Sequence, residues 1–414
     1  MTTDDDFCCP EFAAVSRRGL FSGAVALAGA TTLVGSAAVT ASAAAASPAA
    51  SVLVVVSLRG AADGLSLVVP HADPVYYSAR PRIAIPADRL LAKDAMFGLH
   101  PQLAPLLPLW TRGQLAAVHA TGLPAPNRSH FAAMEAVEDA DPGSSARSGW
   151  LNRLIGQVPG SSPLQGFNMS GGVAPTSLFG AQPTMSAEAV DGVRLPGEDR
   201  WDHGERRRSL RTLWGRDRSA LGRAMRATYS AVDSFAPAHR AADNAGRYPD
   251  SDLGKALAQV ARTIRGNVGV EVFTVDHGDW DMHASLGSAD RGWLVDNTRE
   301  LAGAIAAFFD DLGGQRGKVT LVTISEFGRR VVENASQGLD HGYGNVMLVA
   351  GAGVRGGRYY GSWPGLSAGD DADLLVTTDY RSVLAEIVAT RFRASTAAVF
   401  PRFRPERVGV MTSL

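Results

Sequence analysis

A short segment between residues 276 and 283 combines three carboxylates and two imidazoles. It reads Asp-His-Gly-Asp-Trp-Asp-Met-His and follows an apolar, β-branched run. Such groups are costly to bury without a counter-charge, which a divalent cation bound by carboxylate oxygen and imidazole nitrogen would supply. Asp281 and His283 are spaced so that an extended loop can point both side chains inward. This density of ligand types indicates a metal or catalytic site. The alternative is a polar loop whose carboxylates cap the next helix.

Two further motifs add candidate ligands. Asp340 and His341 form a second carboxylate–imidazole pair in a glycine-rich stretch, although Asp-His-Gly is also an ordinary turn sequence. Glu326 stands directly after another apolar run, where a metal ligand or a general base could lie. The alternative role for Glu326 is a simple ion pair with Arg329 or Arg330.

Asp63 and residues 128–130 complete the candidates. Asp63 follows the first apolar run among small residues, where it could reach a cation or form an ordinary aspartate–glycine turn. Ser129 precedes an expected helix, and the simplest interpretation of this serine is a helix N-cap. A helix N-terminus also favours a phosphoryl or sulfuryl group. Arg128 and His130 would then be neighbouring anion and metal contacts.

The elements that must position these residues alternate between strand and helix from residue 51 onward. Strands are expected at 52–58, 114–119, 268–275, 319–324 and 345–350, and helices at 99–109, 130–139, 206–232, 253–265, 291–312 and 379–391. Apolar, β-branched strands separated by helices predict a mostly parallel sheet covered on both faces, with its ligand site at the carboxyl ends of the strands. Residues 159–204, rich in Gly, Pro, Ser and Asp, are interpreted as an irregular or β-hairpin insertion over the core.

The first 45 residues have the pattern of an export signal. Arg17 and Arg18 are followed by a weakly apolar run from 23 to 39 and by an Ala-Ser-Ala site at 41–43, which resembles a cleaved twin-arginine leader. The alternative is an uncleaved anchor, but the run is shorter than the ~20 residues that span a bilayer. We therefore expect the twin-arginine export machinery to deliver residues 46–414 to the cell envelope, the periplasm or the medium, without stable membrane insertion.

Composition excludes several other classes of protein. The formal net charge of −1 over 414 residues provides no global field for nucleic acid or an anionic membrane. The two cysteines, at positions 8 and 9, lie in the predicted leader, so the mature chain would have no disulfide and no cysteine nucleophile. A Walker A loop is missing from the sequence, which disfavours an NTPase.

Five motifs in order resemble the bacterial DUF1501 proteins. They are Leu58–Leu65, Asn127–Phe131, Trp280–His283, Ser325–Arg329 and Asp340–Gly342. That family is placed with the alkaline phosphatase and sulfatase superfamily, which implies an α/β/α sandwich around a largely parallel sheet and a divalent-metal site of Asp and His. The resemblance matches Asp63 to the acid after the first strand and Ser129 to the position of the nucleophile. It matches the pairs at 281/283 and 340/341 to the two later ligand pairs.

The sequence also departs from the superfamily pattern. No histidine follows His341, and the sulfatase Cys/Ser-x-Pro-x-Arg motif is missing, so the number of metals and the nucleophile stay open.

We expect an exported, metal-dependent hydrolase of phosphate or sulfate esters. Its divalent metal would be zinc, with manganese, iron or calcium as alternatives. The expected metal ligands are Asp63, Asp281, His283, Asp340 and His341, and the expected catalytic residues are Ser129, Arg128, Glu326 and His130. One rival is a non-catalytic envelope protein that keeps the fold to bind a ligand. A second rival is a metal-free hydrolase that uses Glu326 and Asp281 as an acid/base pair.

Overall fold

A computed structural model describes residues 31–34, 37–40, 48–144, 147–157, 164–170, 172–195 and 204–412. The predicted twin-arginine motif and cleavage site lie outside the described residues. Within these ranges, no helix has the length and the apolar character that crossing a membrane requires.

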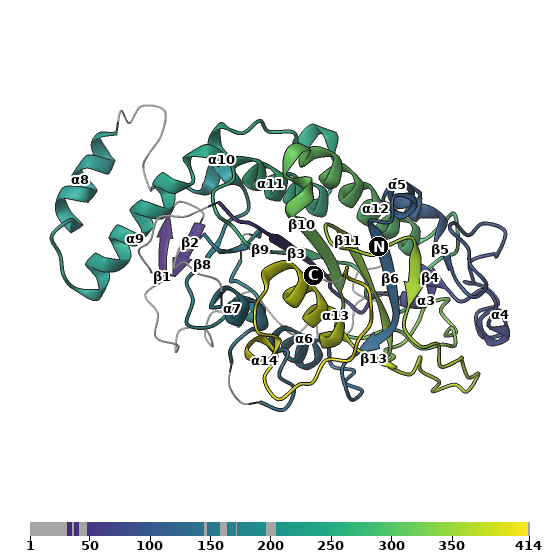
Figure 1. The fold of residues 1–414 in the computed structure, drawn as a ribbon. Helices are drawn as coiled ribbons and strands as arrows, with labels where there is room; N and C mark the ends of the chain where they lie inside the picture. Colours follow the sequence, from purple (N-terminus) through teal and green to yellow (C-terminus); the bar gives the residue numbers. More distant parts are fainter. Residues whose placement is uncertain are drawn as a thin grey trace, which may run out of the picture.

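A large, mostly parallel sheet forms the centre of the protein (Figure 1). Its central strands are parallel neighbours in the order β8 (Thr184–Ser186), β7 (Gly166–Asn168), β9 (Val272–His277), β3 (Val52–Leu58) and β10 (Val319–Ile324). Next come β11 (Asn345–Gly351), which is antiparallel to both of its neighbours, β6 (Leu115–Gly122), and β12 (Arg358–Tyr360) and β13 (Thr378–Asp379), each parallel to β6. The predicted mixed α/β architecture with a mostly parallel sheet is confirmed.

Helices cover both faces of this sheet, and the central strand β3 is therefore buried on both sides. Its residues alternate between two apolar cores: Val54 and Val56 face one, and Leu53 and Val55 face the other. The first core is covered by α10 (Ala236–Arg240), α11 (Asp252–Gly266) and α12 (Trp293–Asp311) (Figure 1). The second is covered by α6 (His130–Asp139), α7 (Trp150–Ile155), α13 (Tyr380–Ile387) and α14 (Thr396–Val399).

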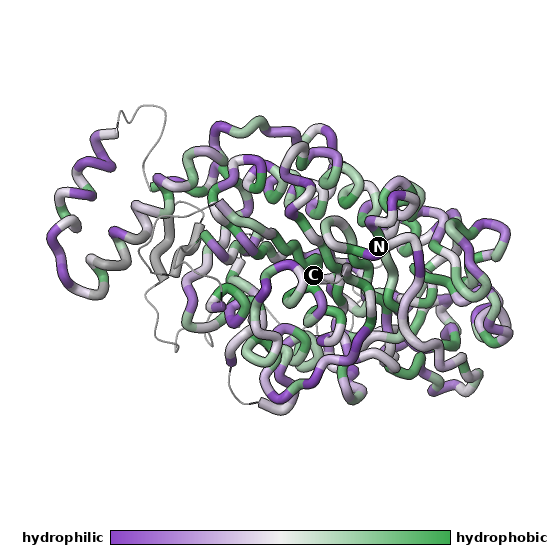
Figure 2. Tube along the Cα trace, viewed as in Figure 1, coloured by the Kyte–Doolittle hydropathy of each residue, from purple (hydrophilic) through white to green (hydrophobic). Residues whose placement is uncertain are grey.

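Further helices and strands complete the described part of the chain. They are α3 (Gly64–Leu67), β4 (Val68–Val69), α4 (Pro74–Ala79), β5 (Gly98–Leu99), α5 (Leu107–Thr111), α8 (Glu205–Trp214) and α9 (Ala220–Ser234). The single helix predicted at 206–232 is thus two helices, because the chain turns after Gly215 and Ser219 caps the second one. Helices α8 and α9 extend beyond the end of the sheet (Figure 1), and hydrophilic residues lie along α8 (Figure 2).

Two features of the sheet differ from the sequence-based expectation. Residues 159–204 contain β7 and β8, which are parallel members of the central sheet, so the interpretation as an irregular or hairpin insertion over the core is wrong for these strands. Strands of three residues are too short to show a periodicity. In addition, β1 (Thr31–Val34) and β2 (Ala37–Thr40) form a hairpin on β8, within the predicted leader. Removal of that leader would leave β8 at the edge of the sheet.

The topology brings the candidate motifs to one edge. Strands β3, β9 and β10 are parallel and end there, at Leu58, His277 and Ile324. Because β11 runs the opposite way, it begins at the same edge, and the residues just before Asn345 lie there too. Strand β6 ends at this edge as well, and α6 starts a few residues later.

Candidate metal centre

Three imidazoles surround one carboxylate oxygen at this edge. The Nε2 atoms of His283, His130 and His341 lie 3.0, 3.6 and 3.7 Å from Oδ1 of Asp281. The Nε2 atom of His341 lies 3.0 Å from the Nε2 atoms of both other histidines. These four residues, which we call the His/Asp cluster, come from α6, the loop after β9 and the loop before β11.

Each histidine of the cluster has an oxygen acceptor behind it. Nδ1 of His130 lies 2.8 Å from Oε1 of Glu326, and Nδ1 of His283 lies 3.1 Å from Oδ1 of Asp340. Nδ1 of His341 lies 2.8 Å from the main-chain oxygen of Arg128. A carboxylate or a carbonyl oxygen can only accept, so each Nδ1 carries a hydrogen, and the Nε2 lone pair of each ring points into the cluster once that nitrogen is deprotonated. Histidines that bind metals are held by this kind of partner.

The donor set fits a divalent cation. Facing lone pairs at 3.0 Å repel one another unless a proton or a cation lies among them. Imidazole nitrogen and carboxylate oxygen are ligands that zinc and similar borderline metals accept. The donor atoms of His130, Asp281 and His341 lie within 4.8 Å of one another. His283 extends this group through its contacts with Asp281 and His341.

Arg329 supports the carboxylate from the buried side. Its Nη2 atom donates to Oδ1 of Asp281 at 2.6 Å, and its Nη1 atom donates to Nε2 of His283 at 3.2 Å. The remaining guanidinium hydrogens bind main-chain oxygens, including those of Gly60 and Ala61. Gly60 has a φ of +106°, and a Cβ atom there would lie 2.6 Å from the main-chain nitrogen of Asp281. A glycine is therefore needed where the loop after β3 meets the Asp281 loop.

Without a metal, charge interactions in and around the cluster shift the pKa values of Asp281, His130 and Glu326. Burial would raise the pKa of Asp281, but its close contacts with the three histidines and the hydrogen bond from Arg329 hold this pKa well below its usual range. Burial would lower the pKa of His130, but its hydrogen bonds and charge interactions with Asp281 and Glu326 raise it to about 9. Burial likewise opposes ionisation of Glu326, yet His130 and main-chain N–H groups lower the pKa of Glu326. The metal-free cluster therefore carries a proton on His130 at neutral pH.

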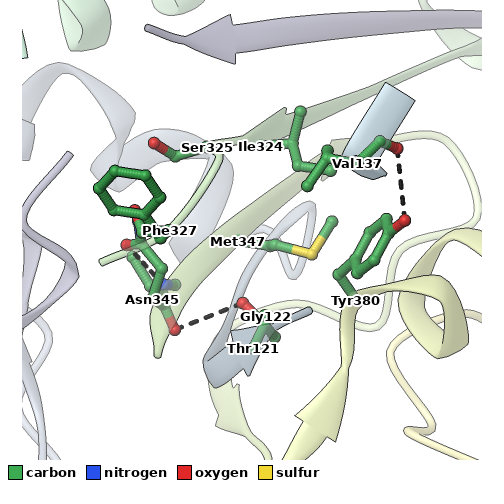
Figure 3. Close-up of a pocket in the computed structure, with 10 residues that line it drawn as sticks. Thr121, Gly122, Val137, Ile324, Ser325, Phe327, Asn345, Met347 and Tyr380 are labelled. Carbon is green, nitrogen blue, oxygen red and sulfur yellow. Dashed lines mark hydrogen bonds between the residues drawn. The ribbon is translucent and has the colours of Figure 1, made fainter. Parts of the chain in front are cut away.

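One side of the cluster is accessible to solvent. The side chains of His283 and His341 are 29% and 16% exposed, whereas His130 is 2% exposed. On the inner side, at the end of β10, Ser325 and Phe327 line a small cavity of about 10 Å³ (Figure 3). That volume holds at most about one water molecule. The exposed side chains of His283 and His341 therefore mark a side of the cluster that a ligand can reach.

The structure brings together three of the predicted metal ligands, Asp281, His283 and His341. It adds His130, which the sequence predicts as a metal contact and a catalytic residue, to the same group. This follows from α6, whose first residue is His130, at the same edge of the sheet.

Two predicted residues support histidines instead of facing the centre of the cluster. Asp340, predicted as a ligand, accepts hydrogen bonds from His283 and Asn334 through Oδ1. Glu326, predicted as a base or ligand, accepts from His130 and from the N–H of Gly60 through Oε1. Its Oε2 accepts from the hydroxyl of Ser325, at 3.0 Å. These contacts give Glu326 the role of holding His130 in position.

Asp63 is not part of the cluster, which corrects the prediction that it binds metal. Both of its oxygens are held by the guanidinium of Arg80, at 2.5 and 3.0 Å. The Arg80 side chain is completely buried and has no other carboxylate partner among its described contacts. Asp63 therefore neutralises a buried arginine.

Arg128 and Ser129 lie beside the cluster. The side chain of Arg128 is exposed and pairs with Asp373, while its main-chain oxygen holds His341. Ser129 occupies the N-cap position of α6 and is half-buried, but its side chain makes no capping hydrogen bond. The predicted N-cap position of Ser129 is therefore confirmed, although its side chain does not provide the capping hydrogen bond.

Sequence reasoning missed the role of Arg329. We considered Arg329 only as an ion-pair partner of Glu326, because the two are close in sequence. The available signal was the pair Arg329 and Arg330 shortly after the strand that ends at Ile324, and it did not say which acid either arginine would bind.

The fold and the site define a class: a mixed α/β protein with a histidine and aspartate cluster at the carboxyl edge of its sheet. The family model described as "Protein of unknown function (DUF1501)" matches residues 95–396, which include the whole cluster. The chain therefore belongs to the DUF1501 family, as the sequence motifs predicted. A comparison with curated proteins finds no match.

Proposed function

We propose that this protein is a metal-dependent hydrolase of phosphate or sulfate esters, with a fold of the alkaline phosphatase and sulfatase type. One observation carries the proposal: three Nε2 atoms, each with its Nδ1 bound to an oxygen, converge on one oxygen of Asp281. The members of the cluster, His130, Asp281, His283 and His341, would hold one metal. Zinc suits this donor set best, with manganese, iron and calcium as alternatives.

Each residue around the cluster has a separate task in this proposal. A divalent cation would polarise an ester oxygen and lower the pKa of an attacking hydroxyl or water. Glu326 and Asp340 hold two imidazole rings in position, and Arg329 fixes Asp281. The exposed side of His283 and His341 leaves room for the substrate.

Ser129 is the candidate to attack the ester or to hold its anionic group. It directly precedes His130 at the N-terminus of α6, where the helix dipole favours an anion. Its side chain is not engaged in capping. We assign Glu326 to the positioning of His130, and we assign no residue as the general base.

A hydrolysis assay with an internal control tests this proposal. Aryl phosphate and aryl sulfate esters are incubated with the purified protein after addition of zinc, manganese, iron or calcium. We expect turnover that a chelator abolishes and that Asp281→Asn lowers by about 10³-fold or more, the scale of losing a group that stabilises the transition state. His71→Ala, which removes an imidazole outside the cluster, keeps the activity. Activity that resists the chelator would contradict metal dependence and favour the acid/base alternative.

A non-catalytic binding protein is the second candidate. The observation that favours it is the ion pair between Arg329 and Asp281, which supplies part of the counter-charge without a metal. In that case Asp281→Asn would lower the thermal stability, and no ester would be turned over under any metal condition.

We also propose export through the twin-arginine pathway. Its support is the leader sequence alone. A tagged chain with Arg17→Lys and Arg18→Lys should remain in the cytoplasm, whereas the unaltered chain is exported. Export of both chains to the same extent would contradict this route.

A further inference from the structure

Two arginines beside the His/Asp cluster converge on a single carboxylate. The guanidinium of Arg128 binds Oδ2 of Asp373, and Nη1 of Arg330 lies 3.3 Å from Oδ1 of the same residue. Arg330 also donates to Oδ1 of Asp371 at 2.7 Å through Nη2. Both oxygens of Asp373 are thus held by guanidinium groups from two different loops.

The main chains of both arginines belong to the surroundings of the cluster. The carbonyl oxygen of Arg128 accepts from Nδ1 of His341 at 2.8 Å, and the N–H of Arg330 donates to the carbonyl oxygen of Asp340 at 3.0 Å. The residue that follows Arg128 is Ser129, and the residue before Arg330 is Arg329. The arginine pair is therefore built into the loops that form the cluster.

We propose that Arg128 and Arg330 form a subsite for the tetrahedral oxyanion of the substrate, and that Asp373 occupies this subsite as an internal competitor when no substrate is bound. Guanidinium groups bind carboxylate, phosphate and sulfate oxygens through the same donor geometry, so the Asp373 carboxylate stands where two oxygens of an oxyanion would bind. The proposal rests on the proposed function for the identity of the substrate.

Asp373 is placed so that an anion can displace it. The Arg128 side chain is 41% exposed and that of Asp373 is 11% exposed, so solvent and a dissolved anion reach this ion pair from the Arg128 side. Residues 367–371, just before it, are all exposed. Rotation of the Asp373 side chain would free both arginines while the neighbouring buried residues Ala372 and Leu374 keep the loop in place.

Calorimetric titration with inorganic phosphate, and separately with sulfate, tests the subsite on the full-length protein. We expect Asp373→Asn to bind the oxyanion about tenfold more tightly than the wild type, since the competitor loses its charge. We expect Arg330→Ala to bind it about tenfold more weakly. Asp370→Asn, an exposed acid of the same loop, and Arg358→Ala, an exposed arginine on β12, are the charge-matched controls and should change the affinity by less than about twofold.

The outcomes separate the subsite from simpler explanations. Equal affinities of the Asp373→Asn and Asp370→Asn variants would overturn the proposal. A lower melting temperature of Asp373→Asn without a gain in affinity would overturn it as well, because Asp373 would then only pin its loop. A preference for phosphate over sulfate, or the reverse, identifies the class of ester.

The experiments test the subsite proposal and the hydrolase proposal independently. If oxyanion binding responds to both variants as expected but no ester is turned over, the subsite stands and the hydrolase does not. If esters are turned over and neither variant changes the oxyanion affinity or KM, the hydrolase stands and the subsite is wrong.

Discussion

Glu326 and His130 share a hydrogen bond of 2.8 Å between Oε1 and Nδ1, and the same oxygen accepts the N–H of Gly60, also at 2.8 Å. One carboxylate oxygen therefore joins the end of β10, the start of α6 and the loop after β3. This contact fixes the His130 ring with its Nε2 atom toward Asp281. It gives Glu326 a positioning role and, in the proposed metal site, would make His130 a ligand.

Replacing Glu326 by Gln should loosen this arrangement without removing a ligand. We expect metal affinity to fall by about 10- to 100-fold, as it does for other partners of metal-bound histidines. In the metal-free variant the pKa of His130 should fall from about 9 toward its ordinary value, because one of its two anionic partners is lost. Metal competition and an imidazole NMR titration measure both effects. The matched control is Glu300→Gln, which alters a glutamate next to His277, and an equal loss of affinity in both variants would contradict the assignment.

Asp340 should behave as a supporting residue and not as a ligand. Because it contacts Nδ1 of His283, we expect Asp340→Asn to lower metal affinity about tenfold while the protein still binds one equivalent of metal. His283→Ala, which removes a ligand, should lower the affinity much further. Titration of both variants with a metal-sensitive dye compares them. Complete loss of metal in Asp340→Asn would mean that Asp340 is a ligand after all.

The sequence predicts the strands and helices that position this site better than it predicts the roles of the individual residues. The bounds of β3, α6 and β10 follow from apolar runs and a polar break, and the structure confirms all three. Because parallel strands end at one edge, the same pattern brings Asp281, His283 and His341 together. The direction of β11 was not predictable, since a buried run looks the same in either orientation.

Sequence alone left the buried arginines unassigned. Asp63 and Asp281 both follow apolar strands and both bind an arginine in the structure, but only Asp281 faces histidines. The difference comes from Arg80 and Arg329, whose places depend on packing between loops that are far apart in the chain. The same packing places the carboxylate of Glu326 against Nδ1 of His130.

Asp63 should matter for stability and not for metal binding. Asp63→Ala leaves the Arg80 guanidinium buried without its charge partner, and the free energy of unfolding should fall by about 3–5 kcal/mol. The double variant Asp63→Ala/Arg80→Met should recover part of this loss, because it removes both charges. Urea unfolding measures the change, and the milder Asp63→Asn variant serves if the alanine variant does not fold. Loss of bound metal from a stably folded variant would contradict this assignment.

Metal affinity should rise with pH. The pKa of His130 is raised to about 9 in the metal-free protein, so a proton must leave before its Nε2 atom can bind a cation. We expect the affinity to increase by about tenfold per pH unit up to about pH 9, with about one proton released on binding at pH 7. Calorimetry in buffers with different ionisation enthalpies counts this proton. An affinity that is independent of pH between 6 and 8 would contradict a protonated His130.

The same raised pKa stabilises the metal-free protein at low pH. A group whose pKa is higher in the folded state contributes its full stabilisation below its unfolded pKa and loses it as the pH rises through the folded value. For His130 this window runs from about 6.5 to about 9. The melting temperature of the metal-free protein should therefore decrease across that window more than it does in His130→Gln.

The metal content of the full-length protein tests the central claim most directly. After incubation with zinc and removal of free metal, elemental mass spectrometry should find about one equivalent in the wild type and in His71→Ala, and none in Asp281→Asn or His341→Ala. Circular dichroism confirms that each variant is folded. If the wild type binds no zinc, manganese, iron or calcium, or if the two cluster variants keep their metal, the cluster is not a metal centre.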